Sequence, residues 1–214
     1  MTATDLKLQL KTAHDRHEES SRVRLHRAIS WLARAEQEPD DLDARFIFLW
    51  IAFNAAYAKQ FGFEQTERDQ LQDFINALVQ ADSTGQLKQA VFQQFSGPIR
   101  VLIENKFVFE PFWRALREHD ASDAWQKSFD AGKSRAMSAL MGNQTQVVLS
   151  IVFDRLYVLR NQLVHGGATW NSQVNRPQVS DGARILGTLV PLILGIMIEH
   201  PELDFGEILY PVVM

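Results

Sequence analysis

Cysteine is absent from this 214-residue sequence. Its absence excludes disulfide bonds, thiol nucleophiles and cysteine-ligated metals. Long hydrophobic runs are also lacking, because the longest apolar stretch, residues 186–198, is interrupted by Pro191 and is shorter than the roughly 20 residues that cross a bilayer. Residues 1–10 contain no continuous apolar segment typical of a signal peptide. We therefore expect a protein of the reducing cytoplasm without a membrane segment.

A strong excess of positive charge is lacking too. The formal net charge is −4 and the pI is about 5.9, which argues against a protein that coats nucleic acid without specificity. A nuclease with this charge would need a local positive cleft. The 46% hydrophobic and 22% charged residues are typical of an ordered globular protein.

Sequence motifs for metals and common cofactors are missing. The chain contains no HExxH, no paired Glu-x-x-His, no P-loop, no GxGxxG and no GxSxG. We therefore expect no metal and no cofactor.

What the sequence does contain is helical periodicity. Apolar residues recur at intervals of three and four along most of its length, which predicts an all-α helical bundle. The expected helices are 5–38, 42–59, 67–80, 86–95, 99–118, 121–141, 145–165 and 183–199. The length suits one domain, 1–214, in which the middle region, about 64–141, is a candidate insertion packed on the core helices.

The most informative stretch is residues 157–167, YVLRNQLVHGG. On an ideal helix, an apolar stripe to be buried is formed by Val152, Leu156, Leu159 and Leu163. The opposite side carries Asp154, Asn161 and His165 within about 40° of one another. Arg160 lies about 140° round from His165. The two residues therefore meet only if the Arg side chain bends across or a second copy supplies the partner.

The end of this helix favours a charged imidazole. Gly166 and Gly167 can take the positive φ that ends a helix, which places His165 in the last turn. Unpaired carbonyls there help a histidine to hold a proton. A histidine that exchanges a proton beside an arginine and an amide suits binding and cleavage of a phosphodiester.

The spacing Arg-x-x-x-x-His is weak evidence by itself, because it occurs twice. The second match joins Arg114 to His119 in RALREH. Here Ala115 follows the arginine, no glycine follows the histidine, and the chain runs into the polar string EHDASD. We interpret this second match as the solvated end of a helix.

Together with its surrounding residues, the first match, Arg160 to His165, resembles the motif of the HEPN superfamily. The segment LYVLRNQLVHGG carries an arginine, a polar residue, several further residues and a histidine, late in a helical chain. The segment FIFLWIAFNAAY, Phe46 to Tyr57, looks like the second core helix of some HEPN subfamilies. The resemblance implies a four-helix core with additional helices and a metal-independent endoribonuclease of prokaryotic defence or toxin-antitoxin systems. It also implies RNA as substrate, a homodimer that pairs two motif helices, and an antitoxin or defence-system partner.

The resemblance also implies roles for the motif residues. His165 would transfer protons, Arg160 would hold the phosphate, and Asn161 would orient the histidine or donate a hydrogen bond to the phosphate. The RNA 2′-hydroxyl would attack the adjacent phosphate and leave a 2′,3′-cyclic phosphate. One departure is Gly167, because a tyrosine often stands at that position in HEPN toxins paired with a nucleotidyltransferase. We therefore do not expect regulation by modification of such a tyrosine.

Four further residues are candidates for supporting roles. Asp154 and Tyr157 lie on the motif helix. Asn54 interrupts an apolar helix and needs a hydrogen bond, made either to a neighbouring helix or in support of Arg160 or His165. Arg176, in an expected polar loop over 168–179, either contacts RNA phosphate or has no role.

Two other functions stay open. The chain could be a non-catalytic module that binds a protein or a nucleotide, in which case the motif side chains would be bonded within one protomer and no cleft would be open. It could instead be a structural subunit of a defence complex. A dense aromatic group, Phe107, Phe109, Phe112 and Trp113, is typical of a core or dimer interface and less often of base stacking.

Overall fold

The computed structural model describes residues 1–58 and 67–212, and in these ranges it is helical without any strand. The chain is thus an all-α helical bundle, as the periodicity predicts. It divides into two compact units, residues 1–86 with 182–214 and residues 87–181. That the whole chain forms one domain with an insertion at about 64–141 stays a prediction.

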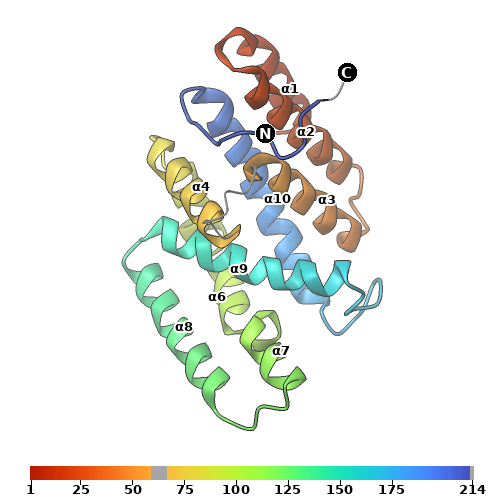
Figure 1. Ribbon diagram of the computed structural model, residues 1–214, viewed down its shortest axis with the longest axis vertical. Helices are drawn as coiled ribbons and strands as arrows, with labels where there is room; N and C mark the ends of the chain where they lie inside the picture. Colours follow the sequence, from red (N-terminus) through yellow and green to blue (C-terminus); the bar gives the residue numbers. More distant parts are fainter. Residues whose placement is uncertain (59–66, 213–214) are drawn as a thin grey trace. The chain divides into compact units, whose positions relative to one another are not determined.

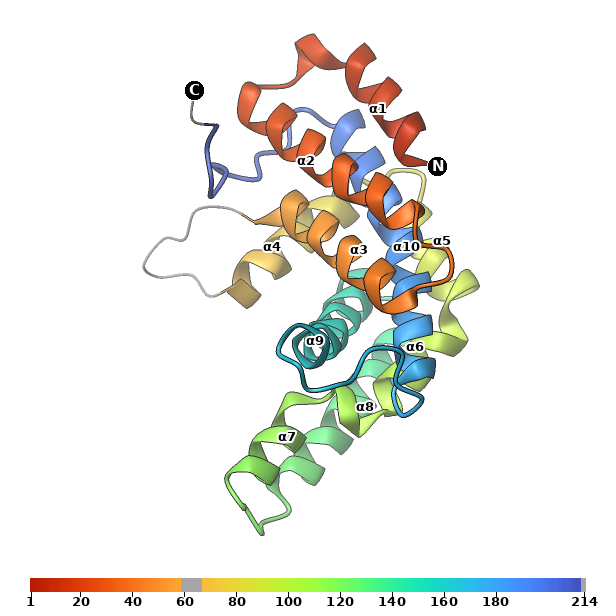
Figure 2. The same ribbon diagram turned by 90° about the vertical axis from the view of Figure 1, so that its right-hand side faces the viewer.

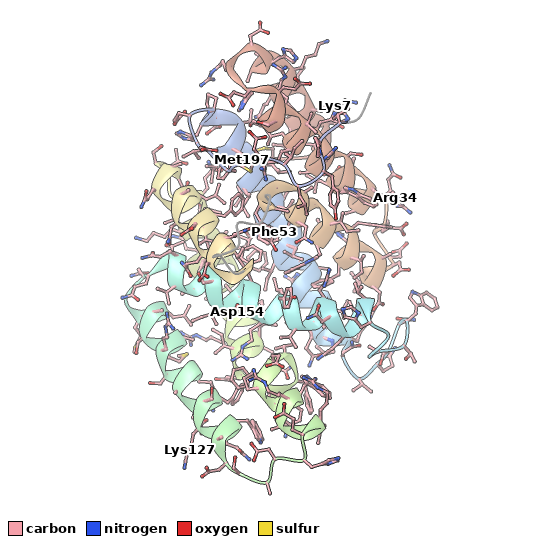
Figure 3. All side chains as sticks on the ribbon, viewed as in Figure 1. Lys7, Arg34, Phe53, Lys127, Asp154 and Met197 are labelled. Atoms are coloured by element: carbon pink, nitrogen blue, oxygen red, sulfur yellow. The ribbon has the colours of Figure 1, made fainter. Side chains whose placement is uncertain are left out.

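The first unit consists of five helices and one short turn of 3₁₀ helix. They are α1 (Ala3–Thr12), η1 (His14–Arg16), α2 (Glu19–Glu36), α3 (Leu42–Tyr57), α4 (Glu67–Ala81) and the larger part of α10 (Arg176–Glu199). The first three α-helices lie side by side in chain order (Figures 1 and 2). Lys7 and Arg34, on α1 and α2, are labelled in Figure 3.

The prediction of one helix over 5–38 is wrong, because the chain bends between α1 and α2. His17 is extended at φ −106°, ψ 140°, and only 4% of it is exposed. Its Nε2 lies 3.1 Å from the Ile198 carbonyl oxygen, and Arg16 donates to the Glu199 carbonyl at 3.2 Å. These carbonyls end α10 and lack helical partners. The bend at His17 therefore satisfies the end of another helix.

Helix α3 supplies the aromatic centre of this unit. Phe46 and Phe53 are 0% exposed, and the Phe53 ring packs against Tyr57 at 4.9 Å and Phe74 at 6.2 Å between centroids. Phe53 is labelled on α3 in Figure 3. A helix that is apolar nearly all round is expected to be buried on all sides. In α3 this holds only in part, because one face, with Ile47, Phe48 and Ile51, is half-buried.

A buried arginine fastens the end of α3 to the C-terminal segment. Arg24 is 2% exposed and donates to the carbonyls of Ala56, Ala58, Phe205 and Gly206 at 2.7 to 3.2 Å. Burial lowers the pKa of Arg24, and Asp204 and Glu207 partly oppose that shift. Four carbonyl acceptors replace the water that the guanidinium loses on burial.

The second unit begins within the short helix α5 (Gln86–Gln89). It continues with a π-helical segment η2 (Ala90–Gln94), α6 (Ser96–Glu104), a 3₁₀ turn η3 (Lys106–Val108), α7 (Glu110–Arg117), α8 (Ala124–Met141) and α9 (Thr145–Val164). Helix α7 lies along α8, and α8 contacts α9 (Figures 1 and 2). Lys127 marks the outer part of α8 in Figure 3.

The prediction of one helix over 99–118 is also wrong. The chain leaves the helix at Asn105, whose side chain accepts from the Phe107 amide at 2.9 Å. Such asparagine caps compete with helix continuation. Pro111, in the first turn of α7, is tolerated there because that position has no helical acceptor for an amide. The break produces the 3₁₀ turn η3, which lies beside the motif on α9.

Helices α7, α8 and α9 end in the same Schellman geometry. A residue with positive φ follows each C-cap: His119 (52°), Asn143 (51°) and Gly166 (70°). The next amide then donates back to a carbonyl in the last turn, at 2.9, 2.9 and 2.7 Å respectively. Glycine takes this conformation without a Cβ penalty. The end of α9 therefore has less backbone strain than the ends of α7 and α8.

Helix α10 begins at Arg176, earlier than the predicted residue 183, and continues through Pro191. It is the one helix in the described ranges that is long and apolar enough to span a membrane, but 72% of its apolar window is buried. Met197 of this helix, labelled in Figure 3, is 2% exposed. Such burial is typical of a core helix of a soluble protein.

Candidate functional site

The site begins with the buried face of α9. Val152, Leu156 and Leu159 are 0% exposed, so the predicted apolar stripe is confirmed over most of its length, and Leu163 is half-buried at its end. Burial of this stripe sets the rotation of the helix. The rotation in turn decides which motif side chains reach solvent.

His165 is the C-cap of α9, one position beyond the last helical residue. Its backbone is at φ −95°, ψ 14°, and its amide donates to the carbonyls of Asn161 and Leu163. The imidazole is exposed and makes no hydrogen bond or ion pair with any residue in 1–58 or 67–212. Both ring nitrogens can therefore exchange protons with a ligand.

Arg160 is held by its neighbours on the helix. Its Nη1 donates to Oδ1 of Asn161 at 2.8 Å, and its Cζ lies 5.8 Å from the centre of the Tyr157 ring. It is half-buried and makes no ion pair with a carboxylate of the described chain. A half-buried guanidinium without a counter-charge is a strong attractor of anions.

Asn161 completes this pair. Because its Oδ1 accepts from Arg160, the same geometry leaves its Nδ2 group to donate. This amide makes no other side-chain hydrogen bond within the part of the chain that the structure describes. Arg160 and Asn161 together thus present guanidinium and amide donors, the groups that bind phosphate oxygens.

Asp154 lies on α9 two turns before Asn161 and is labelled in Figure 3. It is half-buried, as are Asn161 and Arg160. Its charge acts on the neighbouring Arg155: burial lowers the pKa of Arg155 to about 10, and Asp154 partly opposes that shift. A role of Asp154 or Tyr157 in supporting the motif stays a prediction.

Asn54 lies in the first unit, whereas the motif lies in the second. Its Oδ1 is buried and accepts no hydrogen bond within the described residues. A buried acceptor without a partner costs about 1 to 3 kcal/mol. Support of Arg160 or His165 by Asn54 stays a prediction.

Arg176 is the first residue of α10, so its expected position in a loop is wrong. The residue is half-buried, and its Nε is inaccessible to solvent. The helix starts here because the loop after α9 ends at Asn175 and Pro177 suits a first helical turn. Contact of Arg176 with RNA phosphate stays a prediction.

Arg155, which the motif pattern does not indicate, joins α9 to its neighbours. It is 5% exposed, and its guanidinium lies 4.4 Å from the Phe109 ring centre and 5.4 Å from that of Phe129. Its Nη1 also donates to the Val108 carbonyl at 3.4 Å. A sequence signal for this role exists, because Arg155 falls between Val152 and Leu159 on the apolar face, where a charge needs partners.

Gln162, inside the motif, makes a second contact that the pattern does not predict. Its Nε2 donates to the Phe107 carbonyl at 2.6 Å, and the same oxygen accepts from Nε1 of Trp113 at 2.8 Å. Gln162 lies seven residues, about two turns, after Arg155 on the same face of α9. The two side chains thereby fasten the η3 turn beside the motif. No local feature of the sequence predicts this contact.

The second Arg-x-x-x-x-His match differs in its charges. Arg114 donates to Glu110 at 2.6 Å, and Arg117 donates to the other oxygen of Glu110 at 3.2 Å. His119 lies beyond the C-cap with φ 52°. The arginine of this match is therefore neutralised, whereas Arg160 has no carboxylate partner within the described ranges.

Together these observations define an all-α protein in which the last turns of α9 carry an arginine without a carboxylate partner in the described ranges and an exposed histidine. No family model, curated protein or solved structure matches the chain significantly. Across residues 1–58 and 67–212, no three His, Asp or Glu side chains are grouped so that they could hold a metal ion.

Proposed function

We propose that this protein is a metal-independent endoribonuclease of the HEPN type. The observation that carries the proposal is the end of α9. Within the described residues, the Arg160 and Asn161 side chains offer donors without a carboxylate partner, and the exposed His165 ring makes no hydrogen bond. This combination provides an oxyanion site and a proton carrier, the two parts that phosphodiester cleavage by an internal hydroxyl needs.

In this mechanism the RNA supplies its own nucleophile. The 2′-hydroxyl oxygen attacks the adjacent phosphorus as its proton passes to a base. The bond from phosphorus to the 5′-oxygen breaks as that oxygen takes a proton from an acid. His165 exchanges these protons, while Arg160 and the Asn161 amide bind the non-bridging oxygens as charge grows on them. The products carry a 2′,3′-cyclic phosphate and a 5′-hydroxyl.

The site is composite in this proposal. Arg160 and His165 lie about 140° apart around the helix. The Arg160 side chain bonds to Asn161 and contacts Tyr157, and within the described residues it makes no hydrogen bond to His165. A homodimer would place Arg160 of one protomer beside His165 of the other. Cytoplasmic action in a defence or toxin-antitoxin system, with an antitoxin or defence partner, belongs to the same proposal.

The test is cleavage of single-stranded RNA by the purified protein in excess EDTA, with analysis of the product ends. The variants are His165→Asn and Arg160→Ala. The second motif match supplies matched controls: Arg114→Ala, and His119→Asn, because asparagine tolerates positive φ. We expect cyclic phosphate ends, loss of cleavage by at least about 100-fold in the first pair, and wild-type rates in the controls.

The runner-up is a non-catalytic module that binds a protein or a nucleotide. It is favoured by the bond between Arg160 and Asn161 within one protomer. If the wild type cleaves no RNA, or if His165→Asn cleaves as fast as His119→Asn, the nuclease proposal is wrong and this second function takes its place.

A further inference from the structure

An exposed aromatic cluster surrounds the η3 turn in the second unit. The Phe107 ring is 49% exposed and packs edge-on against Phe112, with ring centres 5.6 Å apart. The centre of the Trp113 ring lies 6.3 Å from that of Phe107. An aromatic ring with half its surface in water is the arrangement that stacking ligands use.

The cluster carries positive charge. The Lys106 ammonium lies 5.3 Å from the Phe107 ring centre and 5.4 Å from that of Phe112. On the adjoining helix, Arg114 and Arg117 both pair with Glu110, and the Glu118 carboxylate also acts on Arg114, so the positive charge beside the rings is that of Lys106. Aromatic rings interleaved with cations suit a ligand that combines flat bases with phosphates.

The Phe107 turn is fixed directly to the motif. The Phe107 carbonyl accepts from Gln162, a residue between Asn161 and His165. By helical geometry, His165 lies about 60° round from Gln162 and less than one turn beyond it. The main chain at Phe107 therefore lies beside the turn of α9 that leads to His165.

We propose that Phe107, with Lys106, is a stacking subsite that binds one unpaired base of the RNA strand cleaved beside His165. The inference rests on the proposed nuclease function and extends it, because it names the residues that would hold an unpaired base next to the cleaved bond. A base-paired strand keeps its bases stacked inside the helix and cannot offer one to the Phe107 ring.

Binding is measured separately from cleavage. The probe is a short 2′-O-methyl oligoadenylate, which lacks the attacking hydroxyl, and its binding is followed by fluorescence anisotropy. A matched probe carries abasic residues on the same phosphate backbone. We expect the wild-type protein to bind the adenylate about 5-fold to 150-fold more tightly than the abasic probe.

Two substitutions at Phe107 separate stacking from apolar bulk. Phe107→Leu fills space against Phe112 and Trp113 but removes the flat ring, whereas Phe107→Tyr retains the ring. Both leave the main-chain acceptor of Gln162 and Trp113 in place, so the turn itself is preserved. We expect Phe107→Leu to bind both probes equally and Phe107→Tyr to discriminate as the wild type does.

Lys106 and Leu116 supply further comparisons. Lys106→Ala should weaken binding of both probes alike and reduce the salt dependence by about one charge. Leu116, 58% exposed on α7, is the control for an exposed apolar side chain. We expect Leu116→Ala to bind both probes like the wild type.

Three results would overturn the subsite: a wild type that binds neither probe, a Phe107→Leu variant that still discriminates, or a Phe107→Leu variant that loses only self-association and thereby identifies a protein interface. These results are distinct from failure of the proposed nuclease. Loss of cleavage in His165→Asn with unchanged activity in Phe107→Leu would leave the nuclease standing without the subsite. If the protein binds bases through Phe107 but cleaves no RNA, the subsite stands and the nuclease proposal is wrong.

Discussion

At the scale of single residues, three arginines have three different environments. Arg24 is surrounded by main-chain carbonyls, and Arg155 lies between two aromatic rings. Arg160 bonds to the Asn161 amide oxygen and lies near the Tyr157 ring, and it has no carboxylate partner within the described ranges. The first two are therefore structural, because their donors and charge are already used, and the third is the one able to bind an anion.

The prediction at this scale concerns Arg155. Arg155→Ala removes the cation–π contacts with Phe109 and Phe129 and leaves a cavity, so the free energy of unfolding should fall by about 2 to 4 kcal/mol. Arg155→Lys keeps the charge but not the planar stacking, so its free energy of unfolding should lie between those of the wild type and the alanine variant. Urea unfolding followed by circular dichroism measures both. A loss within about 0.5 kcal/mol for the alanine variant would contradict the structural role.

At the scale of elements, the end of α9 sets the position of His165. Gly166 ends α9 with φ 70°, and a Cβ added at this position would have no other atom within 4 Å. A side chain there would thus be resisted by the backbone conformation alone, not by a clash. This relaxed end places His165 at the C-cap and exposes it.

The prediction for this helix end is a pair of glycine substitutions. Gly166→Ala should destabilise the protein by about 1 kcal/mol. Gly132, inside α8 and equally open, is the matched control, since Gly132→Ala should stabilise by about 0.5 to 1 kcal/mol. Thermal unfolding of both variants measures the difference. Equal effects of the same sign would show that φ at Gly166 does not constrain the α9 terminus.

The ion pairs of Glu110 on α7 should make the free energy of unfolding depend on pH in the acidic range. The hydrogen bond from Arg114 lowers the pKa of Glu110 below its ordinary value of 4.5, and Arg117 adds to the effect. The folded state therefore holds the carboxylate more firmly than the unfolded chain. The contribution of the ionised Glu110 to the free energy of unfolding is complete above pH 4.5. It is lost as the pH falls through the lower pKa that Glu110 has in the folded state.

Because Glu110 is about half exposed, this contribution should not exceed about 1 kcal/mol. Urea unfolding between about pH 3 and pH 6, conditions chosen around the carboxylate range, should show a shallower decline for Glu110→Gln than for the wild type. Glu104, which is exposed and makes no ion pair in the described ranges, is the control. Equal slopes for wild type and Glu110→Gln would exclude the effect.

At the scale of the whole molecule, the proposed composite site requires two copies of the chain. Light scattering on the purified protein should then give the mass of a dimer. A mixture of equal amounts of Arg160→Ala and His165→Ala, unfolded and refolded together, should recover about one quarter of wild-type cleavage. Half of the dimers are then mixed, and each mixed dimer has one intact site of two.

The control for this mixture is each variant refolded by itself, which should stay inactive. Recovery of activity only on mixing supports sites shared between protomers. A dimer that recovers no activity on mixing would place Arg160 and His165 of each site in the same protomer instead.

The sequence alone determined the helical class and the location of the candidate site. Periodicity at three and four residues marks helices because it reports which face is buried, and the buried stripe of α9 lies where this periodicity predicts. Gly166 and Gly167 likewise mark the end of α9, because positive φ is a local property of the chain. These features depend on neighbours a few residues apart.

The tertiary structure decided what depends on distant partners. The bend at His17 follows from the end of α10, about 180 residues away in sequence, and the fastening of Phe107 to the motif follows from Gln162. The same holds for Arg114 and Arg160, which the sequence presents in similar motifs, although only the first is neutralised by a carboxylate within the described ranges. Periodicity cannot reveal such partners, because a hydrogen bond or ion pair is set by the three-dimensional packing of both groups.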